Sequence, residues 1–229
     1  MAVKAVLFDI DGTLVDSNDF HVAAWQEVFR GIGATFDDQT VHDQIGKGAD
    51  MLVPTLLPDL DEAEHQKLGS AQGAIFKDRF IDRVKPFPGA HDLLARVRDD
   101  GIRVVLASSA SAEQRDHYVD LLDARVLISK TTTADDVENT KPAPDIFAVA
   151  LGKLDGVSAD EVLVIGDTPY DIEAARKSGI ATIAVRSGKF TDQALRAAGA
   201  IKLYDDVATL LDDYDASPIG AASATVEPR

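Results

Sequence analysis

The stretch Val3-Lys4-Ala5-Val6-Leu7-Phe8-Asp9-Ile10-Asp11-Gly12-Thr13-Leu14-Val15-Asp16-Ser17 decides how the rest of this chain can fold. A short apolar segment ends at two carboxylates one residue apart, and a Gly-Thr turn follows. A bounded apolar run of this kind predicts a strand that is buried on both faces, as in a parallel sheet. Open α/β sheets bind ligands beyond the carboxyl ends of their strands, which is where Asp9 and Asp11 fall. Because unpaired buried carboxylates are costly, we expect a cation between them, and a hard divalent ion such as Mg²⁺ suits oxygen ligands.

Composition restricts the partners of the chain. It has 229 residues, which allows one large domain or one domain that carries a smaller insert. The formal net charge of −16 argues against a surface that binds nucleic acid or an anionic membrane. The sequence contains no cysteine, so disulfides and thiol chemistry are excluded. We find no signal peptide, and no apolar run approaches the roughly 18 residues of a membrane span, so we expect a soluble, cytoplasmic protein.

Helical patterning fills the segment 17–86. Apolar residues recur at spacings of three and four over 20–32, with Asn18 or Asp19 available as the N-cap. Almost no strand signal interrupts the segment, so we interpret it as an all-helical insert. The two prolines within 85–89 cannot continue a helix and predict the hinge back to the first domain. The further helices expected in the insert are 37–44 and 61–84.

From residue 87 onward, apolar strands alternate with helices. Repeated βα units predict a parallel sheet with helices on both faces, a Rossmann-like α/β fold. We therefore expect a core made of residues 1–16 and 87–215. The tail over 216–229 is small, polar and contains proline, so we expect it to be disordered. The strands expected in the second part of the core are 102–107, 125–128, 162–165, 181–185 and 201–203.

Polar residues follow further strands of the predicted core. Ser108 and Asp167 each come directly after an apolar strand, and Lys141 precedes a predicted helix. Asp171 lies four residues after Asp167, across a turn into another helix. Because the carboxyl ends of parallel strands share one edge of the sheet, we expect these side chains to meet the paired acids of the first strand.

These residues resemble the four motifs of the haloacid dehalogenase superfamily of aspartate-nucleophile phosphotransferases. The motifs stand in the family's order, and the helical insert between the first two resembles the α-helical cap of β-phosphoglucomutases and phosphoglycolate-type phosphatases. The resemblance implies a Mg²⁺-dependent phosphatase that acts on a small phosphorylated metabolite. The matching residues are Asp9-x-Asp11-Gly12-Thr13, Ser108, Lys141 and Gly166-Asp167-x-x-x-Asp171.

The resemblance also implies a role for each matching residue. Asp9 would be the nucleophile that forms an aspartyl-phosphate. Asp11 would protonate the leaving oxygen and then activate water, and its backbone carbonyl would bind the metal. Lys141 would hold the phosphoryl group and Asp9. The phosphoryl ligands implied are Thr13, Ser108 and nearby backbone N–H groups, and the Mg²⁺ ligands implied are Asp9, Asp11, Asp167 and Asp171.

Several of these residues have simpler interpretations. Asp16 and Asp171 fit the positions of helix N-caps or turn residues. Ser108 taken alone is an ordinary turn serine, and Ser109 or Ser111 competes with it for the phosphate site. These alternatives stay open at the level of the sequence.

Two features of the insert are candidate substrate contacts. His21 lies on the first predicted helix, and the family pattern places a histidine near the catalytic acid; a surface or core histidine is the alternative. Lys47 lies in the loop Ile45-Gly46-Lys47-Gly48-Ala49-Asp50, which resembles the family's substrate-reading cap loop. It would supply the local positive charge that the chain as a whole lacks, whereas the alternative is an exposed loop lysine.

Two other functions are compatible with the same fold. A phosphomutase of the β-phosphoglucomutase type has the same core and cap. Mutases of that group, however, have a Glu-Asp pair in the fourth motif, where this chain has Gly166-Asp167. Those mutases also carry an arginine near the position of Ala49. A non-catalytic phosphate-binding module on this fold would be expected to lack Asp9, Asp11 or Lys141, and all three are present. We expect the protein to be a monomer.

Overall fold

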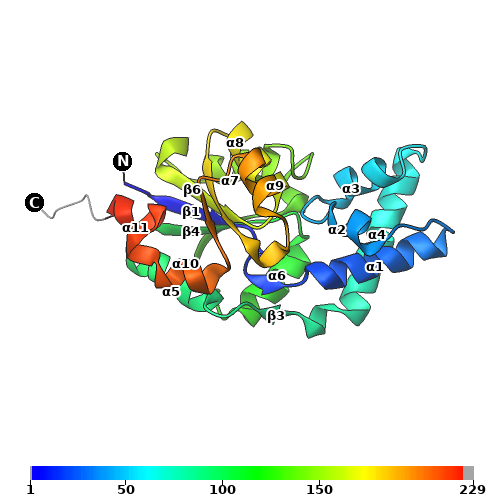
Figure 1. The fold of residues 1–229 in the computed structure, drawn as a ribbon, viewed down its shortest axis with the longest axis horizontal. Coiled ribbons are helices and arrows are strands. Elements are labelled where there is room, and N and C mark those ends of the chain that lie inside the picture. The colour runs from blue at the N-terminus through cyan, green and yellow to red at the C-terminus, as the bar shows by residue number, and fades with distance from the viewer. Residues whose placement is uncertain (1, 224–229) are drawn as a thin grey trace, which may run out of the picture.

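Four consecutive apolar residues form β1 (Ala5–Phe8), and all four side chains are fully buried. The other strands of its sheet are β4 (Arg103–Ala107), β5 (Ile128–Thr132), β6 (Val162–Gly166), β7 (Ala181–Val185) and β8 (Lys202–Tyr204). In the computed structural model, which describes residues 2–223, these strands are parallel and stand in the order β5-β4-β1-β6-β7-β8 (Figure 1). The chain builds outward on one side of β1 and then returns to the other, so the order reverses between β1 and β6. Ligands bind at such a switch point.

Alternate residues of β1 face opposite sides of the sheet, as the period of a strand requires. Ala5 and Leu7 pack with the helices on one side, and Val6 and Phe8 pack with those on the other. The helices of the first side are α7 (Asp145–Gly152), α8 (Pro169–Lys177) and α9 (Asp192–Ala198). Those of the second side are α5 (Ala90–Asp99), α6 (Ala112–Leu121), α10 (Val207–Asp212) and α11 (Pro218–Ser223). Figure 1 shows helices above and below the sheet, which confirms the predicted α/β class.

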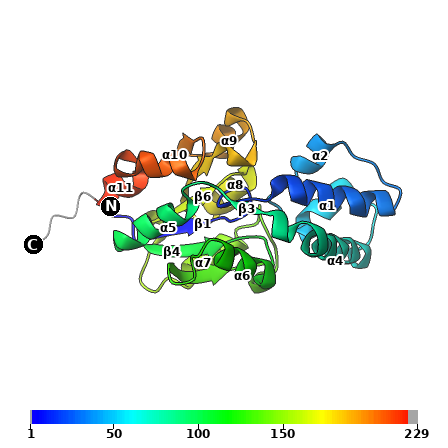
Figure 2. The same cartoon turned by 90° about the horizontal axis from the view of Figure 1, so that it is seen from below.

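A second group of helices lies beyond one end of the sheet (Figures 1 and 2). They pack around a hydrophobic cluster of their own that includes Trp25, Phe29 and Leu52. The chain passes from the core to the insert through β2 (Val15–Asp16) and returns through β3 (Lys85–Pro86), and these two strands pair antiparallel. Strand β3 therefore lies in the predicted hinge. Among the described residues, no helix is both long enough and apolar enough to cross a bilayer. The helices of the insert are α1 (Asn18–Gly31), α2 (Asp38–His42), α3 (Ala49–Leu56) and α4 (Glu62–Arg79).

Most predicted bounds differ from the structure by one or two residues, and two elements differ by more. The helix predicted over 61–84 ends at Arg79, and Ile81–Arg83 form a 3-10 turn. The strand predicted over 125–128 was wrong, because β5 begins only at Ile128. Val126 is 81% exposed, so its apolar side chain lies in a turn rather than a strand. As an edge strand, β5 needs few apolar residues, and this explains why its polar sequence was missed.

The prediction of a disordered tail from residue 216 was wrong for the part that the structure describes. Helix α11 begins two residues later, and the Ile219 side chain is fully buried in the main core. The Ser217 hydroxyl donates to the Tyr214 carbonyl oxygen and accepts from the N–H of Ile219, which stabilises the turn into the helix. One buried isoleucine therefore outweighs the polar composition around it. The remainder of the predicted tail, 224–229, lies outside the described residues.

Candidate active site

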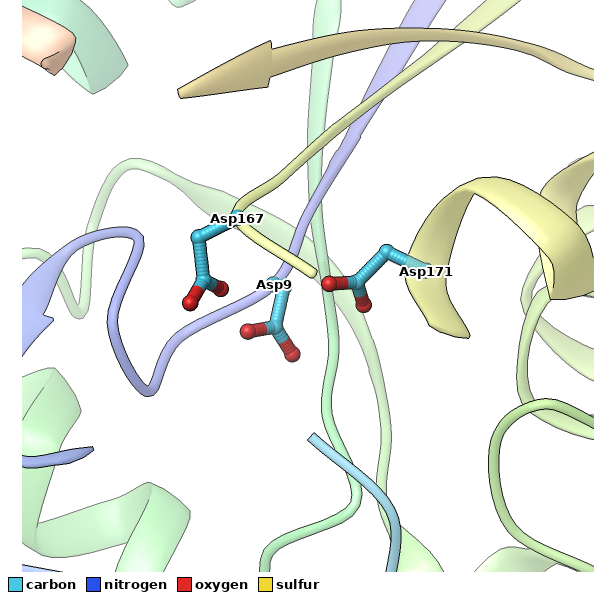
Figure 3. Close-up of side chains that lie close together, drawn as sticks. All are labelled: Asp9, Asp167 and Asp171. Atoms are coloured by element: carbon cyan, nitrogen blue, oxygen red, sulfur yellow. The ribbon is translucent and has the colours of Figure 1, made fainter. Parts of the chain in front are cut away.

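Three carboxylates converge at the switch point of the sheet (Figure 3). Asp9 follows β1, Asp167 follows β6, and Asp171 lies in the first turn of α8. All three side chains are buried, and one oxygen from each lies within 4.8 Å of the others. Oxygen atoms in this number and at this spacing fit a hard divalent cation. The predicted convergence of Asp9, Asp167 and Asp171 is therefore present in the structure, together with a donor set that suits Mg²⁺.

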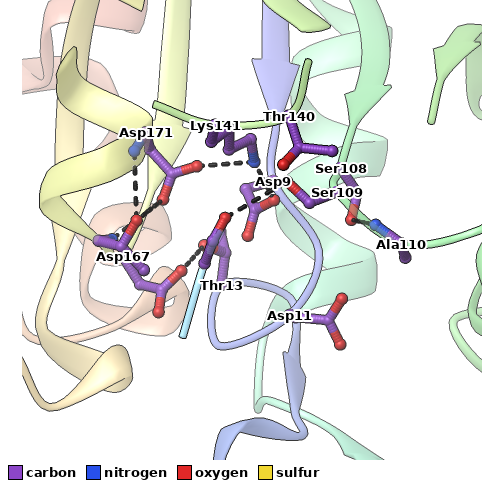
Figure 4. Close-up of polar contacts among 12 residues, drawn as sticks. Asp9, Asp11, Thr13, Ser108, Ser109, Ala110, Thr140, Lys141, Asp167 and Asp171 are labelled. Atoms are coloured by element: carbon purple, nitrogen blue, oxygen red, sulfur yellow. Dashed lines mark hydrogen bonds and ion pairs between the residues drawn. The ribbon is translucent and has the colours of Figure 1, made fainter. Parts of the chain in front are cut away.

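Lys141 contributes the positive charge of the site (Figure 4). It lies in the loop before α7 and is only 1% exposed. Its ammonium forms an ion pair with Asp9 Oδ1 and lies 2.7 Å from Asp171 Oδ1. Lys141 thus holds the nucleophile candidate from one side and a predicted metal ligand from the other.

The acidic side chains outnumber this cation, and their pKa values reflect it. Burial raises the pKa of Asp9 to about 7, although Lys141 opposes the shift. Burial, followed by the charges of Asp171 and Asp9, holds the pKa of Asp167 well above its usual value. Burial lowers the pKa of Lys141, but Asp171 and Asp9 outweigh that effect and keep it charged. A cluster of three carboxylates and one ammonium is short of positive charge, and a divalent ion would balance it.

The carboxylate of Asp167 is oriented by residues from the first loop and the first helix. Thr13 Oγ1 donates to Asp167 Oδ1 at 2.9 Å, and Asn18 Nδ2 donates to Asp167 Oδ2 at 3.0 Å. Gly12 has φ +74°, and a Cβ there would lie 2.2 Å from Asp167 Oδ2, so the close approach requires glycine. The structure therefore places the Thr13 hydroxyl on a carboxylate rather than free for a phosphate. Asn18 is not the N-cap expected from the sequence, because Ser17 occupies that position.

Asp11 points away from the three-carboxylate cluster (Figure 4). Its Oδ1 accepts from Ser17 Oγ at 2.6 Å, lies 3.1 Å from His21 Nε2 and lies 3.5 Å from Gln114 Nε2. Burial raises the pKa of Asp11, but the His21 charge and the hydrogen bonds from His21 and Ser17 outweigh burial and lower it. Asp11 and His21 therefore form a carboxylate–imidazole pair at hydrogen-bond distance. The structure gives no contact for its side chain with the other predicted metal ligands.

His21 is fixed by the cap helices as well as by Asp11. Its ring stacks on Phe76 with the centroids 3.9 Å apart, and its Nδ1 lies 3.2 Å from Gln72 Nε2. Both partners belong to α4, so the insert supplies the environment of a residue that contacts the core acid. The prediction of a histidine near the catalytic acid agrees with this position.

A cavity of about 410 Å³ lies between the strand ends and the insert. Asp9, Asp11 and Ser108 line its core side, while His21 and Trp25 line its insert side. Ser108 is buried, and its hydroxyl oxygen accepts from the N–H of Ala110 at 3.1 Å. Ser109 and Ser111 line the same cavity.

Two predicted substrate contacts are occupied by other partners. Ser109 Oγ donates to the Gly46 carbonyl oxygen at 3.3 Å, so it joins the core to the cap loop. Lys47 lines the cavity, but its Nζ donates to Gln44 Oε1 at 2.6 Å and lies 4.7 Å above the Tyr170 ring. Burial lowers the pKa of Lys47. Its ammonium is therefore held by the protein rather than free in the cavity.

Sequence reasoning missed the amide and hydroxyl residues that surround the acids. Ser17, Asn18, Gln72 and Gln114 contact Asp11, His21 or Asp167, yet none belongs to a motif with an acid or a lysine. Ser17 and Asn18 lie only four and five residues after Thr13 of the first motif, and that proximity is the one signal in the sequence for them. Asp171 belongs to the cap of α8 as the third residue of a capping box whose N-cap is Thr168, and its Oδ1 contacts the Lys141 ammonium; its role as a metal ligand stays a prediction.

The sequence profile of the haloacid dehalogenase-like hydrolases matches residues 6–185. The chain belongs to this family. The match spans every motif residue from Asp9 to Asp171 and confirms the predicted resemblance. N-acetylmuramic acid 6-phosphate phosphatase of Pseudomonas aeruginosa is 31% identical over 198 residues, which cover 82% of this chain and 84% of the relative. The predicted class, a phosphatase of this hydrolase family, is confirmed at that level.

Two further comparisons concern extent and fold. Protein SUPPRESSOR OF QUENCHING 1, chloroplastic, of Arabidopsis thaliana is 30% identical over 216 residues, or 91% of this chain. The match spans only 20% of the length of that relative. A crystal structure of a hydrolase from Pseudomonas syringae superimposes with a TM-score of 0.86 at 28% identity, and the alignment covers 93% of this chain and 98% of that chain.

Proposed function

We propose that the protein is a Mg²⁺-dependent phosphatase that hydrolyses a small phosphorylated metabolite through an aspartyl-phosphate on Asp9. The observation that carries the proposal is the position of the Asp9 carboxylate. It lies at the floor of the cavity, with Lys141 on one side and two further carboxylates beside it. Asp11 lies at the same cavity, two residues along the chain.

The metal would be held by Asp9, Asp167 and Asp171, with the backbone carbonyl of Asp11 as a further ligand. The three side-chain carboxylates meet the requirement for oxygen donors, since one oxygen of each lies within 4.8 Å of the others. When bound, Mg²⁺ would offset negative charge on the phosphoryl oxygens and on the carboxylates around them.

In the first step, an Asp9 carboxylate oxygen attacks phosphorus and the ester P–O bond breaks. The leaving oxygen takes a proton from the pair formed by Asp11 and His21, whose Oδ1 and Nε2 lie 3.1 Å apart. Lys141 stays bound to Asp9 and prevents the carboxylate from turning away from the phosphoryl group. Ser108, which is buried and lines the cavity, holds a phosphoryl oxygen, whereas the N–H groups of Gly12, Thr13 and Leu14 donate to backbone carbonyl oxygens.

In the second step, water attacks the aspartyl-phosphate, and inorganic phosphate and the free Asp9 carboxylate result. Asp11 accepts the proton of this water, returning the Asp11–His21 pair to its starting protonation state. The lowered pKa of Asp11 favours its ionised form, which is the form that acts as a base. Bond making and proton transfer balance over the two steps, and the net reaction is hydrolysis of one phosphate ester.

The helical insert would act as a cap that excludes water during the first step. We propose that the cap comprises residues 17–86. We also propose that the protein is a monomer and that it acts in the cytoplasm. Neither alternative function has an observation in its favour. Ala49 lies near the cap-loop position where mutases of that group carry an arginine, and the presence of Asp9, Asp11 and Lys141 argues against a non-catalytic module.

The decisive experiment measures hydrolysis of p-nitrophenyl phosphate with and without Mg²⁺ by the purified protein and by Asp9→Asn. We expect metal-dependent turnover that falls by at least about 10³-fold in the variant, because the nucleophile is removed. Asp16→Asn is the matched control, since this exposed acid of β2 lies outside the cluster. Equal rates for the wild type and Asp9→Asn would refute the proposal. β-Glucose 1-phosphate, followed by assay of glucose 6-phosphate and free phosphate, separates a mutase from a phosphatase.

A further inference from the structure

The size of the cavity limits the leaving group. Its volume of about 410 Å³ is near the lower end of the roughly 300–1,000 Å³ of small-molecule sites, and the phosphoryl group occupies part of it. Two glycines of α4, Gly69 and Gly73, line the wall that the insert contributes. Outside the backbone of α4 itself, no atom lies within 4 Å of the Cβ position of Gly73, so the wall is open at this residue, whereas Ala49 packs against Gly69. The space suits an alcohol of monosaccharide size or smaller.

The charged side chains that line the cavity are mainly acidic. Asp50 and Glu138 line it in addition to the two acids of the first motif. Within the described part of the chain, Lys47 is the only lysine or arginine that lines the cavity, and Gln44 and Tyr170 already hold its ammonium. The imidazole of His21 also lines the cavity, but its Nε2 is paired with Asp11 at 3.1 Å. A carboxylate or second phosphate on the leaving group would therefore lose water without gaining a free cation, which is costly.

Uncharged polar groups line the rest of the wall. Gln72 and Gln114 present amides, Ser109 and Ser111 present hydroxyls, and Trp25 adds apolar surface. Amides and hydroxyls both donate and accept, so they match the hydroxyl groups of a polyol. The exposed Glu138 at the same cavity is a carboxylate, which can accept hydrogen bonds from substrate hydroxyls and would repel an anion.

We infer that the leaving group of the substrate is an uncharged, hydroxyl-rich alcohol, so that the substrate is a sugar or polyol monophosphate. This inference rests on the proposed phosphatase function and narrows it to one class of ester. It excludes phosphorylated carboxylic acids, bisphosphates and pyrophosphate as preferred substrates.

The test compares two esters that differ at one carbon. Glycerol 3-phosphate ends in a hydroxymethyl group and 3-phosphoglycerate ends in a carboxylate, and each is assayed with the full-length protein and Mg²⁺. Glucose 6-phosphate and 6-phosphogluconate provide a second pair of larger size. In each pair we expect a higher kcat/KM, by at least about tenfold, for the ester whose alcohol part carries no carboxylate. A tenfold difference corresponds to roughly 1.4 kcal/mol in the free energy of the transition state.

A charge reversal at the rim tests the cause of this preference. Glu138→Lys should raise kcat/KM for 3-phosphoglycerate relative to glycerol 3-phosphate by about five- to tenfold, because it places a cation at the cavity. Asp155→Lys is the matched control, since it makes the same charge change at an exposed loop residue that does not line the cavity. The control should leave the ratio within twofold of the wild type.

The outcomes separate this inference from the function on which it rests. Suppose that p-nitrophenyl phosphate is hydrolysed and that 3-phosphoglycerate and 6-phosphogluconate are hydrolysed as fast as their partners or faster. This result would overturn the inference and leave the phosphatase proposal standing. An unchanged ratio in Glu138→Lys would refute the electrostatic explanation. Absence of hydrolysis of every ester, including p-nitrophenyl phosphate, would overturn the phosphatase proposal itself.

Discussion

At the scale of single residues, the site depends on one ammonium held between carboxylates. Lys141 contacts Asp9 and Asp171, is buried, and remains charged because of those two partners. A buried ion pair contributes modestly to stability as a whole, but removal of one partner leaves the other charge unpaired in a medium of low dielectric constant. We therefore expect Lys141 to stabilise the fold of the site in addition to its proposed part in the chemistry.

Lys141→Ala should lower the free energy of unfolding of the metal-free protein by about 3–5 kcal/mol, the usual result of breaking a buried ion pair. Urea denaturation in the presence of a chelator measures this change. The control is Lys189→Ala, which breaks an ion pair with Asp19 whose side chains are 57% and 66% exposed. Exposed pairs contribute about 0–1 kcal/mol, so a loss in the control as large as that of Lys141→Ala would contradict the prediction.

The sequence was sufficient to predict which charged residues would meet, but not how their neighbours are used. Asp9, Asp167 and Lys141 stand at strand ends or helix starts, and the parallel topology brings those points to one edge. The contacts of Thr13 and Asn18 depend on which side chain fills the space beside Gly12. Asn18 reaches an acid 149 residues away, and no periodicity or spacing encodes that contact.

At the scale of elements, one loop of the insert is hydrogen-bonded to Thr140, the residue before Lys141. Thr140 precedes Lys141, and its N–H and hydroxyl donate to the two carboxylate oxygens of Asp50 at 2.9 and 2.5 Å. The N–H of Gly48 donates to Thr140 Oγ1 at 2.9 Å. The start of α3 is thereby fastened to the backbone that positions the ammonium. Docking of the insert and the position of Lys141 are linked through these three hydrogen bonds.

Asp50→Ala should reduce kcat/KM for p-nitrophenyl phosphate by about ten- to a hundredfold, because hydrogen bonds to a charged group contribute roughly 1.5–3 kcal/mol. Steady-state kinetics measures the change. Asp50→Asn should recover part of it, since an amide can accept from the Thr140 N–H and donate to its hydroxyl. Asp38→Ala is the control, because this exposed acid of α2 contacts Gln26 within the insert. Wild-type kinetics in Asp50→Ala would rule out the coupling.

The elements that the sequence predicted best are those with strong apolar periodicity. The buried strands β1, β6 and β7 match their predicted positions closely, because their residues are apolar on both faces. Edge strand β5 and helix α11 were misjudged, because each contains mostly polar or small residues. Ile219 shows the limit of composition as a guide, since its burial depends on a surface that only the complete core provides.

At the scale of the whole molecule, charge sets the conditions under which the site is stable. The chain has a formal charge of −16, and the site concentrates three carboxylates around one ammonium. An anionic substrate therefore approaches a negative protein and a site that is itself short of positive charge. A divalent cation held by the three carboxylates would offset this negative charge, both without substrate and with a phosphate ester bound.

This balance predicts an unusual pH dependence for the metal-free protein. The pKa of Asp9 is about 7 in the folded state, against 3.8 for an ordinary aspartate, and that of Asp167 is also raised. The folded state therefore binds more protons than the unfolded state between about pH 4 and pH 7, and the free energy of unfolding falls as the pH rises through this range. Groups with lowered pKa values, such as Glu161 at about 2, act in the opposite direction but only below about pH 4.5.

Thermal denaturation at several values between about pH 5 and pH 8 measures this dependence, with chelator or with Mg²⁺. In chelator, Tm should fall as the pH rises. Mg²⁺ should raise Tm most at the alkaline end, because it binds the ionised carboxylates of the folded state only. Asp167→Asn should weaken the pH dependence and abolish the response to Mg²⁺, whereas Asp155→Asn, at an exposed loop, should change neither. A Tm in chelator that rises with pH over this range would contradict the prediction. It would show that ionisation of the buried carboxylates stabilises the folded state, so that their pKa values are not raised.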